Sequence, residues 1–91
     1  CMKLQRELQI VNRLGLHARA CAKLVKTANQ FESDIVLHQD ERQADAKSIM
    51  GLMMLAATQG TRLTVITSGA DAEEAMTQVQ HLINNRFEED E

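Results

Sequence analysis

The chain has 91 residues, a formal net charge of −3, 44% hydrophobic residues and only two aromatic residues, Phe31 and Phe87. This composition predicts a globular chain, and the length suits one small domain spanning residues 1–91. The acidic balance and the scarcity of aromatic side chains argue against nucleic-acid binding, which favours basic surfaces and stacking platforms. The sequence contains neither a membrane-length apolar run nor a secretory leader, so we expect a cytoplasmic protein that does not insert into membranes.

The two cysteines, Cys1 and Cys21, match neither a disulfide framework nor a set of zinc ligands. The scattered glycines do not form a nucleotide-binding loop, so we expect no cofactor. His38 and His81 do not pair with other ligand residues at metal spacing, so we expect no metal. We interpret Met2 as the native start and Cys1 as an added residue. Residues 88–91 are all acidic and predict a solvated tail.

Changes in hydrophobic period divide the first half of the chain into elements. Apolar and polar residues alternate over 3–11, which predicts a strand with one wet face. Helical spacing begins at Ala18 and predicts a helix that ends within 29–32, with Cys21 on its inward face. Two short strands are expected over 34–38 and 42–46, joined by a hairpin turn.

In the second half, Ser48 is the expected N-cap of a short helix that reaches about Ala57 and is ended by Gln59-Gly60. A clear strand comes next over 62–67, then a turn at Ser68-Gly69, and then a long amphipathic helix over 71–85. The order is therefore β-α-β-β-α-β-α. Strands with mostly one wet face predict an α+β domain in which helices cover one face of an antiparallel sheet.

The stretch Gly15-Leu16-His17-Ala18-Arg19 is the strongest candidate site. His17 stands where a turn meets the first expected helix, and no Ser, Thr, Asp or Asn caps that helix start. The first backbone N–H groups therefore still need an acceptor. An open helix N-terminus beside an arginine and a histidine is typical of a phosphate site. The alternative is a surface histidine without a role, and Gly15, the missing cap and Arg19 argue against it.

A second candidate is the segment 49–57, which has no polar side chain. A helix that lies on a sheet buries only one stripe, so we expect Leu52 and Leu55 in the core and an exposed, methionine-rich patch for docking a partner. The patch should contain Ile49, Met50 and Met53. The alternative is a helix that is almost fully buried, which a two-layer domain of this size can hardly accommodate.

Ser48 has two compatible interpretations. It is an N-cap, and it is also a candidate for regulatory phosphorylation, because a helix start tolerates the phosphate charge. That charge would lie beside the apolar patch and disfavour docking. We also expect partner contacts on the helix that begins after His17, from Ala18, Ala22 and Lys26.

Two motifs at matching separation resemble one family. Gly15-Leu16-His17-Ala18-Arg19 resembles the active-site signature of HPr, the histidine-containing phosphocarrier of the bacterial phosphoenolpyruvate-dependent phosphotransferase system. Lys47-Ser48-Ile49-Met50-Gly51 resembles the regulatory-serine segment of that family, and Thr58-Gln59-Gly60-Thr61 resembles the family's next segment along the chain. The element order matches as well, so the resemblance covers residues 2–87.

The resemblance implies an open-faced β-sandwich, a four-stranded antiparallel sheet covered on one face by three helices. It implies a stoichiometric carrier rather than an enzyme. His17 accepts a phosphoryl group on Nδ1 from phospho-enzyme I and passes it to an EIIA domain, with the assistance of Arg19. Ser48 matches the serine that HPr kinase/phosphorylase modifies. The residues that match the family's docking surface are Ile49, Met50 and Met53.

One departure leaves the branch of the family open. The family usually has proline directly after the arginine, and this chain has Ala20. The chain is therefore either an HPr of sugar transport or a nitrogen-related paralogue, and the segment around Ser48 favours a kinase-regulated HPr. A purely regulatory binding module switched by Ser48 and a small-ligand sensor are competing hypotheses for the function. We expect a monomer.

Overall fold

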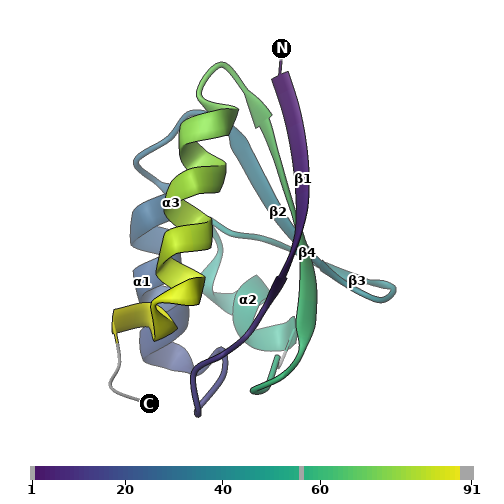
Figure 1. Ribbon diagram of the computed structural model, residues 1–91, viewed down its shortest axis with the longest axis vertical. Helices are drawn as coiled ribbons and strands as arrows, with labels where there is room; N and C mark the ends of the chain where they lie inside the picture. Colours follow the sequence, from purple (N-terminus) through teal and green to yellow (C-terminus); the bar gives the residue numbers. More distant parts are fainter. Residues whose placement is uncertain (1, 56, 89–91) are drawn as a thin grey trace.

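The computed structural model describes residues 2–55 and 57–88, and the expectations for Cys1 and for residues 89–91 lie outside them. The elements in chain order are β1 (Met2–Gln9), α1 (Ala18–Ala28), β2 (Asp34–Gln39), β3 (Arg42–Asp45), α2 (Ile49–Leu55), β4 (Arg62–Gly69), α3 (Ala72–Asn84) and the terminal turn η1 (Arg86–Glu88). Figure 1 shows α1 and α3 side by side against the strands. The predicted element order is confirmed.

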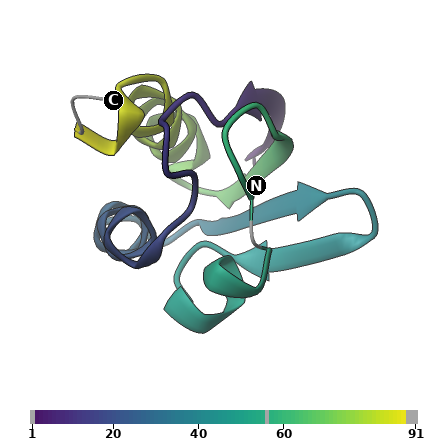
Figure 2. The same cartoon turned by 90° about the horizontal axis from the view of Figure 1, so that it is seen from below.

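The described strands form one four-stranded antiparallel sheet in the order β1-β4-β2-β3. β4 is central and pairs with β1 along its whole length, from Met2 opposite Gly69 to Gln9 opposite Arg62. The three helices of the described chain cover one face of this sheet, as the view from below makes clear (Figure 2). The predicted open-faced α+β architecture is therefore confirmed.

The core lies between the helices and the covered face of the sheet. The alternation predicted for the strands is observed, because Leu8 and Ile10 are buried while Gln5, Glu7 and Gln9 are exposed. The largest buried side chains include Ile10, Leu24, Ile35, Leu37, Leu52, Leu63, Met76, Ile83 and Phe87. Burial of these apolar surfaces is the main stabilising contribution to the fold.

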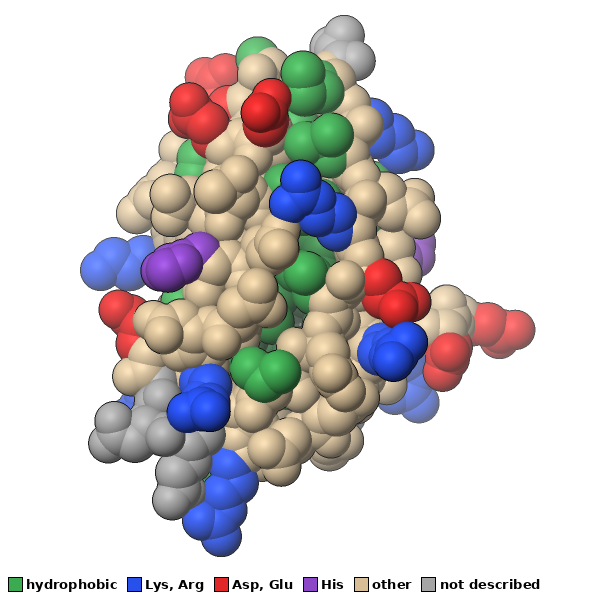
Figure 3. All heavy atoms as spheres, viewed as in Figure 1, with side chains coloured by type: hydrophobic (Ala, Val, Ile, Leu, Met, Phe, Trp, Pro, Cys, Tyr) green, Lys and Arg blue, Asp and Glu red, His purple; other side chains and the backbone are tan. Residues whose placement is uncertain are grey.

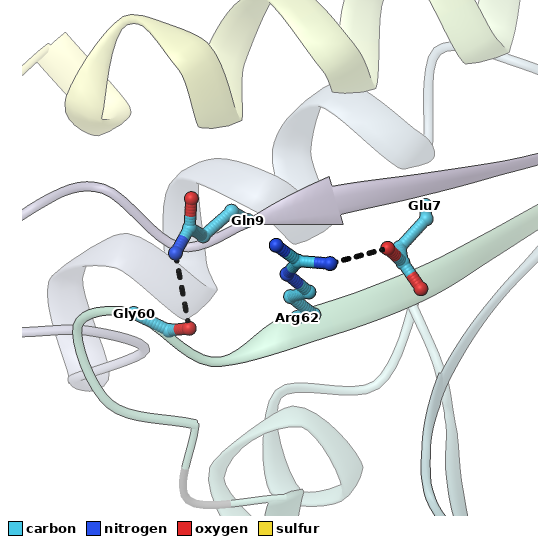
Figure 4. Close-up of polar contacts among 4 residues, drawn as sticks. All are labelled: Glu7, Gln9, Gly60 and Arg62. Carbon is cyan, nitrogen blue, oxygen red and sulfur yellow. Dashed lines mark hydrogen bonds and ion pairs between the residues drawn. The ribbon is translucent and has the colours of Figure 1, made fainter.

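The opposite face of the sheet is polar and open to solvent. Arg62 Nη1 lies 3.4 Å from Glu7 Oε1, and Gln9 Nε2 donates to the Gly60 carbonyl at 3.2 Å (Figure 4). Both members of the ion pair are well exposed, so it contributes little to stability. The contact of Gln9 lies at the lower end of β1, where the chain leaves the sheet toward the candidate site.

Element ends differ from the prediction where tertiary contacts intervene. The predicted turn at Ser68-Gly69 belongs to β4, because pairing with Met2 and Lys3 extends that strand. The prediction that Gln59-Gly60 ends the second helix is wrong, since α2 spans Ile49–Leu55. Ala57 lies beyond the helix, where its carbonyl accepts a hydrogen bond from the Leu16 N–H at 2.9 Å.

The terminal turn anchors the chain to α1. Arg86, Phe87 and Glu88 all have positive φ, and this left-handed turn buries the Phe87 side chain completely. Lys23 Nζ donates to the Phe87 carbonyl at 2.6 Å. A lysine on a helix surface is ordinarily a solvated charge, but the Lys23 ammonium instead holds the end of the described chain against α1.

Asp71 connects the start of α3 to the segment that precedes β2. Its side chain makes no capping bond within α3. It accepts hydrogen bonds from the Ser33 hydroxyl and from the backbone N–H groups of Glu32 and Ser33, at 3.0 and 2.9 Å for the two N–H groups. The hydrogen bond from the Ser33 hydroxyl is the main reason why the pKa of Asp71 lies below its ordinary value of 3.8. Its effect on the pKa is larger than the opposing effect of burial.

Replacing Asp71 with Asn should lower stability in a pH-dependent way. The pKa of Asp71 is depressed in the folded state, so its contribution is present above the unfolded pKa and is lost as pH falls through the folded pKa. In urea titrations, Asp71→Asn should therefore unfold at a lower midpoint than wild type at pH 7. The difference should shrink below about pH 4. The control is Asp34→Asn, at an exposed carboxylate on β2. A gap between wild type and Asp71→Asn that stays the same from pH 7 to pH 3 would contradict this assignment.

Gly15 allows two backbone segments to meet beside the start of α1. Its φ is +66°, and a Cβ atom there would lie 2.4 Å from the Ala57 carbonyl oxygen and 2.9 Å from Thr58 Cα. Both neighbours are backbone atoms, which cannot move aside as a flexible side chain would. A glycine is therefore required here for conformation and for space.

Gly15→Ala should destabilise the fold by about 2 kcal/mol or more, because it combines left-handed strain with a backbone clash. Gly60→Ala is the matched control. Gly60 also has a positive φ, of +90°, but a Cβ atom there would meet nothing within 4 Å. Urea denaturation should show a clearly smaller loss for Gly60→Ala, and equal losses would mean that the contact with Ala57 contributes nothing.

Candidate functional site

His17 is the N-cap residue of α1. Its backbone is extended, with φ −79° and ψ 175°, and its side chain is half-buried. It makes no side-chain capping bond, and the first turn of α1, which the structure describes in full, contains no acidic residue. The predicted absence of an ordinary cap is confirmed.

The open end of α1 consists of backbone N–H groups that precede the helical ladder. The first hydrogen bond of the helix joins the Cys21 N–H to the His17 carbonyl at 2.9 Å. The N–H groups of Ala18, Arg19 and Ala20 come before it, at the end of the helix that carries partial positive charge. Ala20 is fully buried, and its N–H adds a donor that a proline at this position would lack.

The loop before His17 is held by its own backbone and by one buried side chain. Asn12 is fully buried, and its Nδ2 donates to the Gly15 carbonyl at 2.8 Å. The His17 N–H donates to the same carbonyl at 2.9 Å. The sequence analysis gave Asn12 no role. The available signal was the tendency of asparagine to bond to nearby backbone groups in turns.

Basic side chains surround this end of the molecule. Arg19 is exposed in the first turn of α1, and Arg13 is exposed in the preceding loop. Figure 3 shows Lys and Arg side chains at the lower end of the face it presents, while acidic side chains lie at the upper end, where α3 begins, and at mid-height on both sides. The two arginines favour an anion at the start of α1.

Metal ligands, the buried cysteine and helix length complete the description of this part of the chain. Within residues 2–55 and 57–88, no cluster of three or more His, Cys, Asp or Glu side chains could hold a metal ion. Cys21 is buried in the core beside the Leu16 carbonyl, and burial raises the pKa of its thiol. It is therefore a packing residue rather than a reactive one. No helix in this part of the chain has the length and apolar character needed to cross a membrane.

The second predicted feature is present on α2. Leu52 and Leu55 are buried, as expected. The exposed apolar side chains, called the α2 patch below, are Ile49 (42% exposed), Met50 (72%), Met53 (44%) and Met54 (73%). Met54 was not predicted, because helical period alone could not divide this uniformly apolar segment. Ala56 lies outside the described residues.

Ser48 caps α2, as predicted. Its Oγ accepts the Gly51 N–H at 3.1 Å, and its carbonyl accepts the Leu52 N–H at 3.1 Å. The neighbouring Lys47 donates from Nζ to the Phe31 carbonyl at 2.9 Å, which ties the start of α2 to the segment after α1. Ser48 is half-buried and is adjacent in sequence to Ile49 of the α2 patch.

The three residues expected on the surface of α1 form a single stripe. Ala18, Ala22 and Lys26 recur every four residues, and all three are exposed. α1 and α2 pack against each other at the same side of the sheet (Figure 2). His17, the α1 stripe and the α2 patch therefore belong to neighbouring elements, although the chain separates them by about thirty residues.

Comparisons with known proteins agree with this geometry. A family profile described as the PTS HPr component phosphorylation site matches residues 4–85. The phosphocarrier protein HPr of Cupriavidus necator is 53% identical over 88 residues, which cover 97% of this chain and 99% of that protein. The phosphocarrier protein NPr of Shewanella violacea is 40% identical over 87 residues, or 96% of each chain.

A solved structure shows the same arrangement of elements. The crystal structure of HPr-C-His from Thermoanaerobacter tengcongensis superposes with a TM-score of 0.93 at 39% identity, and the match covers 97% of this chain and 99% of that one. The profile match and the identity to curated relatives extend over nearly the whole chain. The chain therefore belongs to the HPr family of phosphocarrier proteins.

Proposed function

We propose that His17 is the residue that carries the phosphoryl group in this chain. The observation that supports this most directly is the position of His17 at the uncapped start of α1, with three backbone N–H groups directly after it. As the family pattern implies, phospho-enzyme I is the donor and a histidine of an EIIA domain is the acceptor. A phosphorus–nitrogen bond to His17 Nδ1 forms as the bond between the phosphoryl group and phospho-enzyme I breaks. In the second transfer the bond to His17 breaks as a bond to the EIIA histidine forms.

The chain's own contribution to this chemistry is positioning and charge stabilisation. The N–H groups of Ala18, Arg19 and Ala20 and the guanidinium of Arg19 can stabilise the negative oxygens of the phosphoryl group. The histidine supplies the nitrogen that accepts the group. The partner enzymes supply the remaining catalytic groups, so this chain acts as a cytoplasmic carrier rather than as an enzyme with its own turnover.

The docking surface in this proposal combines the α2 patch with the α1 stripe. Methionine side chains adapt to partners of different shape, which suits a carrier that must bind a donor and an acceptor in turn. Lys26 adds a cationic group for acidic partners, and Ala18 and Ala22 leave room for close approach.

Substitution of His17 tests the central claim. With enzyme I and phosphoenolpyruvate, wild type should gain the mass of one phosphoryl group in an acid-labile, base-stable form, and His17→Ala should gain none. The matched control is His81→Ala, at an exposed histidine on α3, which should be phosphorylated at the wild-type rate. Equal labelling of His17→Ala and wild type would exclude His17 as the carrier.

Ser48 is the proposed regulatory phosphorylation site, acted on by HPr kinase/phosphorylase. A negative charge beside the α2 patch should disfavour docking without unfolding the chain. Ser48→Asp should therefore raise the KM for phospho-transfer from enzyme I by about tenfold, a cost of ~1.4 kcal/mol in docking.

The control for the charge is Ser48→Ala, which should keep a wild-type KM and lose about 1 kcal/mol of stability with the helix cap. If Ser48→Ala and Ser48→Asp raise the KM equally, the effect comes from the cap and not from the charge.

A nitrogen-related carrier is the second candidate, because Ala20 leaves the branch open and one relative is named NPr. It shares the chemistry of His17 and differs in its acceptor. Transfer rates from the phosphorylated chain to a sugar-type EIIA and to a nitrogen-type EIIA distinguish the two branches.

A further inference from the structure

The loop that carries His17 is held at both of its ends by a single turn. This turn, residues 57–61, comes after α2 in the chain. At the start of the loop, the Ile10 N–H donates to the Thr61 carbonyl and the Gly60 N–H donates to the Ile10 carbonyl, both at 2.8 Å. At the end of the loop, the Leu16 N–H donates to the Ala57 carbonyl at 2.9 Å. The position of His17 therefore depends on the shape of the 57–61 turn.

Two threonines close this turn. Thr61 Oγ1 accepts the Thr58 N–H at 3.1 Å, and the Thr61 N–H donates to the Thr58 carbonyl at 3.0 Å. The two hydroxyl oxygens are 3.3 Å apart and share a further hydrogen bond. The Thr61 hydroxyl thus fixes the peptide unit that joins Ala57 to Thr58. The oxygen of this peptide unit is the Ala57 carbonyl, which accepts the hydrogen bond from Leu16.

Two side-chain amides add hydrogen bonds between the 57–61 turn and the segment around the end of β1. Gln59 Nε2 donates to the Val11 carbonyl at 3.2 Å, and Gln9 Nε2 donates to the Gly60 carbonyl at 3.2 Å (Figure 4). These contacts are exposed, and each is worth little alone. The Thr61 hydroxyl contacts are exposed as well, but they act directly on the peptide unit between Ala57 and Thr58, whose Ala57 oxygen bonds to the residue before His17.

We propose that Thr61 is a positioning residue for phosphoryl transfer at His17. This inference rests on the proposed function of His17. Thr61 does not touch the transferred group. Its hydroxyl orients the Ala57–Thr58 peptide, the Ala57 carbonyl holds the Leu16 N–H, and Leu16 sets the backbone direction at His17. Small displacements of a reacting group cost large factors in rate, so loss of this hydroxyl should slow transfer.

The decisive variant is Thr61→Val, which keeps the shape of the side chain and removes its hydroxyl. Phosphorylation by phospho-enzyme I should show a kcat about tenfold lower than wild type and an unchanged KM, because the α2 patch and the α1 stripe are untouched. Thr61→Ser, which restores the hydroxyl, should recover most of the rate. Urea denaturation at the assay temperature establishes that each variant is folded.

Thr77→Val is the matched control. It also deletes a threonine hydroxyl that bonds to the backbone, because Thr77 Oγ1 donates to the Glu73 carbonyl at 3.0 Å on α3. It should leave kcat and KM at wild-type values. The nitrogen chemical shifts of the His17 imidazole and the Leu16 amide provide a readout that needs no partner enzyme, and Thr61→Val should move both while Thr77→Val moves neither.

The outcomes separate this inference from the proposed function. Wild-type kinetics and unmoved shifts in Thr61→Val would overturn the positioning role, as would equal rate losses in Thr61→Ser and Thr61→Val. If the wild-type chain accepts no phosphoryl group, the proposed function fails, and the His17 and Leu16 shifts still decide whether Thr61 sets the geometry of the loop.

Discussion

The hydrogen bond from the Leu16 N–H to the Ala57 carbonyl is the contact on which the arrangement of the site depends. It joins the loop before α1 to the segment that leaves α2. Gly15 makes it possible, because a Cβ atom at that position would collide with the backbone of Ala57 and Thr58. Through this contact the histidine at the start of α1 and the exposed methionines of α2 become parts of one surface.

The sheet and the terminal turn keep that surface in place. β4 lies between β1 and β2, so the segments on either side of it, the 57–61 turn and the start of α3, are both tied to the core. At the upper end, Asp71 binds the segment before β2 through Ser33 and Glu32. At the lower end, Phe87 is buried and Lys23 bonds to its carbonyl, which secures α3 against α1. The helix whose open N-terminus carries His17 is therefore held in place by contacts on several sides.

Local patterns in the sequence were enough to determine the element order, the buried face of the first strand, the uncapped helix start at His17 and the capping role of Ser48. These features depend on short-range physics, namely hydrophobic periodicity and the hydrogen-bonding needs of helix ends. The exposure of Ile49, Met50 and Met53 could also be predicted, since a helix on a sheet cannot bury every side.

Only the tertiary structure decided where α2 ends, how far β4 extends and which groups hold the loop of His17. Pairing with β1 extends β4 to Gly69, and α2 ends at Leu55, before the Ala57 carbonyl that accepts the Leu16 N–H. The role of Lys23 likewise depends on a partner that is distant in sequence. The roles of Asn12 and Thr61 depend on the backbone conformation of their turns, which composition does not specify. The sequence by itself determined which residues are candidates for the proposed phosphoryl transfer. The long-range hydrogen bonds determined how they are held together, because such bonds depend on which segments the sheet brings into contact.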